Sequence, residues 1–236
     1  MAPELSVVVL AYNEVECLEG VIEELLGELR AVGKRFELII VDDGSTDGTS
    51  AIADGLATLV SQIRVVHHGT NLGLGGGYRT GFREARGDLL TFYPADGQFP
   101  AAIIGQFLPH AAEHDLVLGY LPDRASSLTA RALSFGERVL YRALFGGFPR
   151  FQGIFMIRRR LLDEIPLHSD GRGWAIVMEL ILRAARGRYR LVSVATESRP
   201  RQAGESKVMN ARTIKANLEQ LFALRRLMAR QGGSGG

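Results

Sequence analysis

The chain has 236 residues, of which 46% are hydrophobic, which is enough for one sizeable α/β core without a second domain. No apolar run approaches the roughly 20 residues that cross a bilayer, and the sequence opens into a strand without a signal peptide, so we expect a cytoplasmic protein. The single cysteine, Cys17, excludes an internal disulfide, and its helical surroundings favour a buried structural thiol.

The net charge of +2 conceals an asymmetry between the two halves of the chain. Residues 1–120 hold 7 Lys and Arg against 17 Asp and Glu, whereas residues 121–236 hold 21 against 9. An acidic half with carboxylates at strand ends suits a metal-assisted site, and a basic half suits an anionic partner such as a phosphate or a lipid headgroup. We expect no nucleic-acid partner, because the basic half lacks interleaved aromatic residues and any recognised reader motif.

Short β-branched runs alternate with helical patterns along most of the chain. This alternation predicts an α/β fold with a mostly parallel sheet covered on both faces. We expect strands at Leu5–Ala11, Phe36–Val41, Ile63–Val66, Asp88–Tyr93, Asp115–Tyr120, Phe151–Arg159 and Tyr189–Ala195. Helices are expected at Val15–Arg30, Thr49–Leu59, from near Leu74, at Ala101–Glu113, Ser126–Phe145, in a short segment ending near Ile165, at Gly171–Gly187 and at Ala211–Ala229.

Polar residues follow each of the first two strands. Tyr12 and Glu14 come directly after the first, and the neighbouring acids Asp42 and Asp43 come at the end of the second, before a glycine turn. In open α/β sheets this carboxyl edge is where ligands bind, so the paired carboxylates suggest contacts to a base or ribose. Helix capping is the alternative, and it explains Asp47 better than the pair.

A glycine-rich segment, Asn71–Gly81, follows the third strand. Glycine lets the backbone approach a ligand closely, and a helix that begins near Leu74 would offer free amides to phosphate. The run resembles a dinucleotide-binding fingerprint, but that fingerprint belongs after the first strand, so we give a dehydrogenase little weight.

The fourth strand ends in a further acidic turn. Asp96 and Gln98 lie two residues apart there and supply oxygen ligands of the kind that suit Mg²⁺ or Mn²⁺ carrying a diphosphate.

Four motifs together, LAYNE, VDDGSTDGT, NLGLG and ADGQFP, resemble those of family 2 glycosyltransferases with the GT-A fold, over roughly residues 5–210. The resemblance implies one GT-A domain over residues 1–230, with a nucleotide-sugar half (1–120), an acceptor half (121–230) and a flexible tail (231–236). It implies metal binding by Asp96 and Gln98. The nucleotide-binding residues that it implies are Ala11, Tyr12, Glu14, Asp42, Asp43, Gly73 and Ala95.

One position departs from the family's acidic motif. The motif usually begins with a second carboxylate two residues before the aspartate kept here, and this chain has Pro94 there. With one charge fewer, either the metal would bind more weakly or the diphosphate would depend more on basic side chains.

The segment 121–160 holds eight arginines and only two acids. Its predicted helix, Ser126–Phe145, carries arginines and an apolar stripe on separate faces, so it suits either an anionic membrane surface or an ordinary solvated surface. Periodicity alone favours the second interpretation.

The run R-x-x-G-x-S-K from Arg201 to Lys207, with FQGIFMIRR from Phe151, resembles the family branch that loads sugars onto polyprenyl phosphates, as dolichol-phosphate mannose synthases do. The acid often found before the acceptor glycine is absent, since Pro149 and Arg150 occupy that region. The resemblance implies catalytic roles for Asp96, Arg201 and Lys207, and acceptor contacts from Arg124, Arg131, Ser134, Gln152 and Ser206.

A lone acid, Glu179, lies within an apolar helical pattern. It is either paired with Arg183 at i+4 or a site carboxylate facing the cleft, and pairing is the commoner outcome.

These features lead to the hypothesis of an inverting, metal-dependent transferase that moves mannose or glucose from a GDP- or UDP-linked sugar to a polyprenyl phosphate at the cytoplasmic membrane face. The protein would bind the membrane surface itself or work beside a separate membrane-anchored partner. An ionised phosphate needs no general base, whereas a hydroxyl acceptor does. The alternatives are a transferase for a hydroxyl acceptor, with Glu179 or another acid as base, and a non-catalytic nucleotide-sugar-binding protein.

Overall fold

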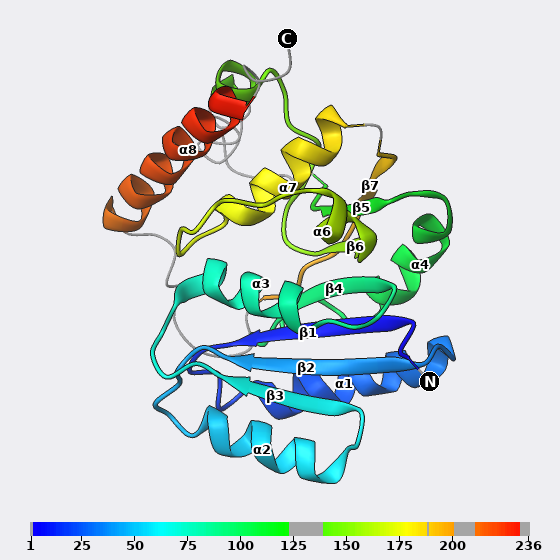
Figure 1. Ribbon diagram of the computed structural model, residues 1–236. Coiled ribbons are helices and arrows are strands. Elements are labelled where there is room, and N and C mark those ends of the chain that lie inside the picture. Colours follow the sequence, from blue (N-terminus) through cyan, green and yellow to red (C-terminus); the bar gives the residue numbers. More distant parts are fainter. Residues whose placement is uncertain (1, 123–138, 188, 201–210, 232–236) are drawn as a thin grey trace.

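A seven-stranded sheet with helices on both faces forms the centre of the computed structural model, which describes residues 2–122, 139–187, 189–200 and 211–231 (Figure 1). The strand order is β3-β2-β1-β4-β6-β5-β7. The strands are β1 (Leu5–Ala11), β2 (Phe36–Asp42), β3 (Ile63–His67), β4 (Leu89–Pro94), β5 (Leu116–Tyr120), β6 (Phe155–Arg158) and β7 (Leu191–Ala195). The helices are α1 (Leu18–Val32), α2 (Thr49–Leu59), α3 (Gly73–Glu84), α4 (Ile103–Glu113), α6 (Arg160–Glu164), α7 (Ala175–Arg186) and α8 (Ala211–Gln231).

Each face of the sheet has its own apolar core, because successive side chains of a strand point to opposite faces. On β1, Val7 and Val9 pack with the buried side of α1 and α4, whereas Val8 packs on the other face with α3 and α7. The prediction of a mostly parallel sheet covered on both faces is therefore confirmed.

The strand β6 is the exception to the parallel arrangement. It runs antiparallel to both β4 and β5, and it is shorter than the predicted strand Phe151–Arg159. The amide of Gln152 donates to the carbonyl of Gly119, and Gly153 takes a left-handed conformation (φ 94°) against the ring of Phe99. This turn delays the regular ladder, which is why the strand begins only at Phe155.

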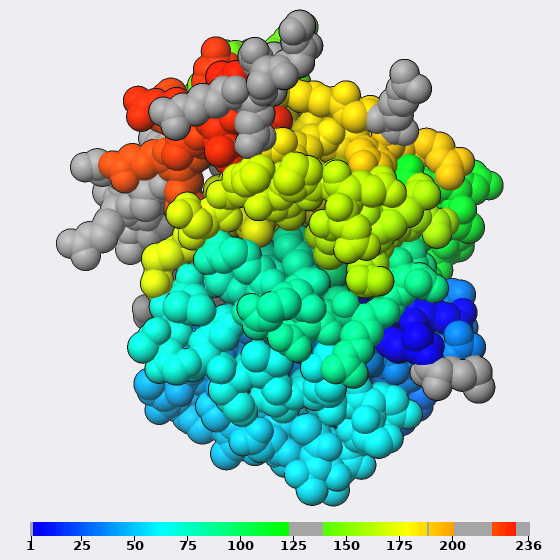
Figure 2. Space-filling model, in the orientation of Figure 1, coloured from blue at the N-terminus to red at the C-terminus, as the bar shows by residue number. Residues whose placement is uncertain are grey.

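The last helix, α8, packs on α7 rather than on the sheet (Figure 1). Leu224 and Met228 of α8 join Met178, Leu182 and Phe145 in a third, smaller core. In Figure 2 the segments up to about residue 75 occupy the lower part of the visible face, and the segments after about residue 150 occupy the upper part. Of the predicted helix Ser126–Phe145, residues 139–145 are helical and the rest lie outside the described residues. No described helix combines the length and the apolar character needed to cross a bilayer.

Candidate active site

The polar motifs predicted from the sequence meet at the carboxyl edge of β1, β2 and β4. Ala11 is the register partner of Asp42, and Leu10 is the partner of Pro94. The loops continue this alignment, since the amide of Asp43 donates to the carbonyl of Ala11 (2.9 Å) and the amide of Ala95 donates to that of Leu10 (3.0 Å). The strands therefore hold the three motifs side by side.

Hydrogen bonds lock the first loop onto the second. Asn13, in a left-handed conformation (φ 53°) that Asn tolerates better than most residues, receives a bond from the amide of Thr46 (2.8 Å) and donates its own amide to Ser45 Oγ (3.0 Å). The amide of Glu14 donates to Thr49 Oγ1 (2.9 Å). This interlocking fixes the place of Tyr12 and Glu14, both of which are half-buried.

Asp42 is buried and acts as a hub within its own loop. Its carboxylate accepts bonds from the amide of Ser45 (3.0 Å) and the hydroxyl of Ser50 (2.5 Å), and it lies 2.8 Å from Nδ1 of His67. Burial opposes ionisation, but these partners outweigh it and hold the pKa of Asp42 below its usual value. Asp42 thus shapes the loop, and its contact with a nucleotide stays a prediction.

Asp43 ties the second strand to the start of α3. Its carboxylate accepts the amides of Leu72 and Gly73 (both 2.8 Å) and lies 2.6 Å from Nδ1 of His68. The amide of Gly75 donates to the carbonyl of Arg172 (2.8 Å). The expectation that this helix start offers free amides to phosphate is therefore wrong for these three groups, because protein oxygens already bind them.

A segment before α7, residues 168–173, covers the start of α3. The guanidinium of Arg79 donates to the carbonyls of Ser169 (3.5 Å) and Gly171 (3.1 Å). A Cβ on Gly75 would lie 2.0 Å from the carbonyl oxygen of Gly171, so only glycine permits this close approach.

Glu179 holds residues 168–173 in place through hydrogen bonds to their backbone. Its side chain is fully buried, one oxygen pairs with Arg183 (2.7 Å), and the other accepts the amides of His168 (2.9 Å) and Ser169 (2.7 Å). The predicted i+4 pair is confirmed. The alternative, a carboxylate facing the cleft, is wrong because both oxygens are committed inside the protein.

In the turn after β4, the carboxylate of Asp96 has acceptor positions that the described protein does not use. One carboxylate oxygen accepts the amide of Gln98 (3.1 Å), and no other group in the described part of the chain bonds to the half-buried Asp96 side chain. Within the described residues there is no cluster of three His, Cys, Asp or Glu that could hold a metal. Asp96 and Gln98 instead fit a Mg²⁺ or Mn²⁺ ion that shares its coordination with ligand phosphates, because such ions often bind one or two protein oxygens.

Two contacts that the sequence did not reveal bring the segment before residue 201 to this turn. The amide of Arg199 donates to the carbonyl of Gln98 (2.7 Å), and its guanidinium forms a two-pronged pair with Glu24 of α1 (2.9 and 3.1 Å). Glu24 also accepts the amide of Ala101 (3.1 Å). Arg199 is exposed and Glu24 is half-buried, and they are far apart in the chain, so no local sequence pattern could have revealed the pair.

Among the remaining predicted site residues, the structure describes Gln152. It is exposed and lies in the turn before β6, beside Gly153, which contacts the ring of Phe99 near the Asp96 turn. The following lie outside the described residues: Arg124, Arg131, Ser134, Arg201, Ser206 and Lys207.

Residues 6–166, about two thirds of the chain, match the protein family described as glycosyl transferase family 2. The chain belongs to this family. Among its relatives, this family 2 transferase is 28% identical to the dolichol-phosphate mannosyltransferase of Saccharomyces cerevisiae, over 95% of this chain and 88% of the relative. It is 30% identical to the undecaprenyl-phosphate mannosyltransferase of Micrococcus luteus, over 85% of this chain and 86% of the relative.

The fold of this family 2 transferase resembles a solved structure of glucosyl-3-phosphoglycerate synthase from Mycobacterium tuberculosis, with a TM-score of 0.67 and 20% identity. The match covers 93% of this chain and 80% of that one. It confirms the predicted GT-A architecture.

His67 gives the site a testable pH dependence. Asp54, then Asp42, raise its pKa above the usual 6.5, so the charged imidazole stabilises the fold below pH 6.5 and this stabilisation is lost as the pH rises through the raised value. The resulting fall in the free energy of unfolding should be under about 1 kcal/mol because the imidazole is partly exposed, and we expect it to be absent in His67→Gln. Urea unfolding of both proteins between pH 6 and 9 measures this free energy. An equal dependence of the unfolding free energy on pH in the two proteins would contradict the assignment.

Proposed function

We propose that this family 2 transferase moves a hexose, mannose or glucose, from a GDP- or UDP-linked sugar to a polyprenyl phosphate of the dolichyl type, with inversion at the anomeric carbon. The observation that carries the proposal is the carboxyl edge, which holds Asp43 and Asp96 and to which the backbone of Arg199 is bonded through Gln98. Two relatives of nearly matching length are named for transfer of mannose to dolichol phosphate and undecaprenyl phosphate, which supports this acceptor class.

On the donor side, Asp96 and Gln98 would hold Mg²⁺ or Mn²⁺. Structural neighbours were solved with Mn²⁺ or Mg²⁺ together with a uridine nucleotide, which supports the proposal of a divalent ion in this protein. Such an ion, when bound, neutralises charge on a diphosphate. Tyr12, Glu14, Asp43, Gly73 and the neighbouring Ala11, Asp42 and Ala95 would shape the nucleoside pocket.

Basic residues would stabilise the leaving diphosphate and bind the acceptor phosphate. Arg201 is two residues beyond Arg199 in the chain, and the amide of Arg199 bonds to the carbonyl of Gln98. We therefore propose that the guanidinium of Arg201 would contact the leaving diphosphate. With Lys207 it would stabilise the negative charge that develops as the glycosidic bond breaks. Arg124, Arg131, Ser134, Gln152 and Ser206 are the proposed contacts of the acceptor phosphate.

The acceptor oxygen needs no base in this scheme, because a phosphate is already ionised near neutral pH. Glu179, the side chain that the hydroxyl-acceptor alternative would use as base, is fully buried and bound to Arg183 and two amides. This supports a phosphate over a hydroxyl as the attacking group.

Contact with an anionic membrane surface at the cytoplasmic face would bring the lipid within reach. Two exposed apolar side chains, Val139 and Phe222, lie on the mutually packed segments 139–145 and α8. The exposed arginines Arg142, Arg225 and Arg226 are on the same two segments. Apolar side chains flanked by arginine favour an anionic bilayer surface, with or without a membrane-anchored partner.

Replacing Glu179 tests its role as an anchor. We expect Glu179→Gln to lower the free energy of unfolding by up to about 3–5 kcal/mol, because Arg183 loses a buried charge partner. The pH dependence of kcat should stay unchanged for the folded fraction. Loss of the acidic limb of the pH–rate profile, with normal stability, would instead identify Glu179 as a general base.

Replacing Asp96 tests the donor site. Nucleoside diphosphate release from GDP-mannose and UDP-glucose should require both Mg²⁺ or Mn²⁺ and a short polyprenyl phosphate, and Asp96→Ala should lower it by at least about 100-fold. The exposed Glu113→Ala serves as a control that should retain activity. Release that ignores the lipid, or an active Asp96→Ala protein, would overturn the proposal.

A further inference from the structure

Trp174, the single tryptophan of the chain, is exposed directly before a buried helix. The residue is 37% exposed, whereas residues 175–182 of α7, which follow it, are all buried. Tryptophan carries the largest aromatic ring of the amino acids, so this fraction leaves a sizeable apolar surface. The exposed part of the indole can therefore cover an apolar part of a ligand.

The indole is at the carboxyl edge of the sheet, between α3 and the turn before β6. Its ring centre lies 5.6 Å from that of Tyr78 of α3 and 6.2 Å from that of Phe151. Because β6 runs antiparallel to its neighbours, the turn before it lies at their carboxyl edge, where Gly153 contacts Phe99. Trp174 thus borders both the proposed nucleoside pocket and the turn of the proposed metal site.

The backbone before Trp174 is held on two sides. The carbonyl of Arg172 accepts the amide of Gly75 (2.8 Å), and the amide of Gly173 donates to Oε1 of Gln220 on α8 (3.2 Å). Figure 1 shows α7 beginning on the side of the sheet toward which β1 and β2 point. The indole is therefore fixed at the ligand edge before a ligand arrives, which lowers the entropic cost of binding to it.

The carboxylates nearest to this segment are already bonded inside the protein. Asp43 accepts the amides at the start of α3, and Glu179 binds Arg183 and the backbone of residues 168 and 169. In the described part of the chain, by contrast, no group accepts the Nε1–H of Trp174. The indole therefore offers both an apolar face and a free donor.

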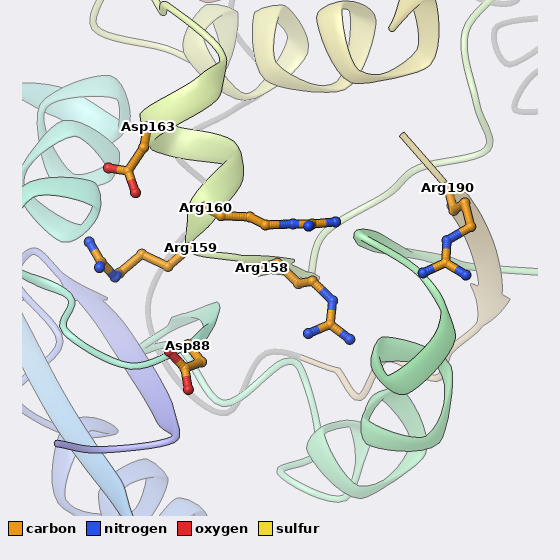
Figure 3. A pocket seen from close by; sticks show the side chains of 6 residues that line it. All are labelled: Asp88, Arg158, Arg159, Arg160, Asp163 and Arg190. Carbon is orange, nitrogen blue, oxygen red and sulfur yellow. The ribbon is translucent and has the colours of Figure 1, made fainter. Parts of the chain in front are cut away.

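The opposite edge of the sheet has a different chemistry. A hollow of about 400 Å³ lies there, where Asp88 directly precedes β4 and Arg190 directly precedes β7 (Figure 3). All the residues that line it are charged, so it presents no aromatic face. They are Asp88, Arg158, Arg159, Arg160, Asp163 and Arg190.

We propose that Trp174 binds the hexose of the nucleotide sugar by stacking its indole on one face of the ring. A hexose has C–H groups on its faces and hydroxyls around its rim, so the indole covers a face while Nε1–H donates to a hydroxyl. A prenyl chain would use the apolar face alone and leave this donor without a partner. The role of Trp174 rests on the function proposed above and adds the residue that recognises the sugar.

Fluorescence of the full chain tests the contact directly, because Trp174 is its only tryptophan. With Mg²⁺ present and lipid absent, saturating GDP-mannose or UDP-glucose should change the emission more than the saturating nucleoside diphosphate of the same base. A short polyprenyl phosphate alone should leave the emission unchanged. A response to the lipid alone, or equal responses to nucleotide sugar and nucleoside diphosphate, would overturn the proposal.

Calorimetric titration of variants separates sugar binding from packing. Trp174→Leu should bind the nucleotide sugar about fivefold more weakly, with little change for the nucleoside diphosphate, because only the stacked ring is lost. Trp174→Phe keeps an aromatic ring against Tyr78 and Phe151 and should show a smaller loss of the same kind. The control Leu59→Ala shortens an apolar side chain that is 83% exposed at the end of α2, and it should bind both ligands like the unaltered chain.

The two ligands also distinguish this proposal from the function on which it rests. Equal weakening of nucleotide sugar and nucleoside diphosphate in both Trp174 variants would show a packing role and overturn the proposal. Binding of the nucleoside diphosphate with no separate effect of the hexose would overturn it while leaving the transferase function intact. Failure of every nucleotide to bind the unaltered chain would contradict that function, and the hexose contact with it.

Discussion

The carboxylate of Asp43 joins parts of the donor edge that are distant in the chain. It lies at the end of β2 and accepts the first amides of α3. It also contacts Nδ1 of His68, whose Nε2 lies 2.8 Å from the hydroxyl of Thr80 within that helix. A helix start has free amides that need acceptors, so a buried carboxylate there both caps the helix and fixes it against the sheet. The place of Gly73, and with it the wall of the proposed nucleotide pocket, depends on this one group.

The acids of this chain fall into two kinds that composition cannot separate. Asp42 and Glu179 are buried, and their oxygens are taken by neighbouring hydroxyls, amides or a guanidinium. Asp96 is half-buried and has a carboxylate oxygen that nothing in the described chain uses. A buried carboxylate with all its bonds made holds structure, whereas one with spare capacity at a ligand edge can take a cation.

The sequence predicted the central sheet well, because buried β-branched runs leave a strong signal. The bounds of β1 (Leu5–Ala11) and of the helix α2 (Thr49–Leu59) were predicted to the residue. The direction of β6 escaped it, since alternation reports burial and not the sense of the chain. The motifs also located the edge where Asp43 and Asp96 meet. They could not tell that Asp42 is internal or that Arg199 pairs with Glu24, because such contacts depend on side chains brought together only by folding.

Glu179 is buried and its oxygens are bonded inside the protein, so it is not available as the base that the hydroxyl-acceptor alternative names. A phosphate acceptor requires no base. Transfer of labelled hexose to a polyprenyl phosphate and to the polyprenyl alcohol of the same chain length separates these chemistries directly. The two acceptors share their apolar chain and differ in the attacking group. Our account predicts a labelled lipid from the phosphate and none from the alcohol. Product from the alcohol at a comparable rate would contradict it.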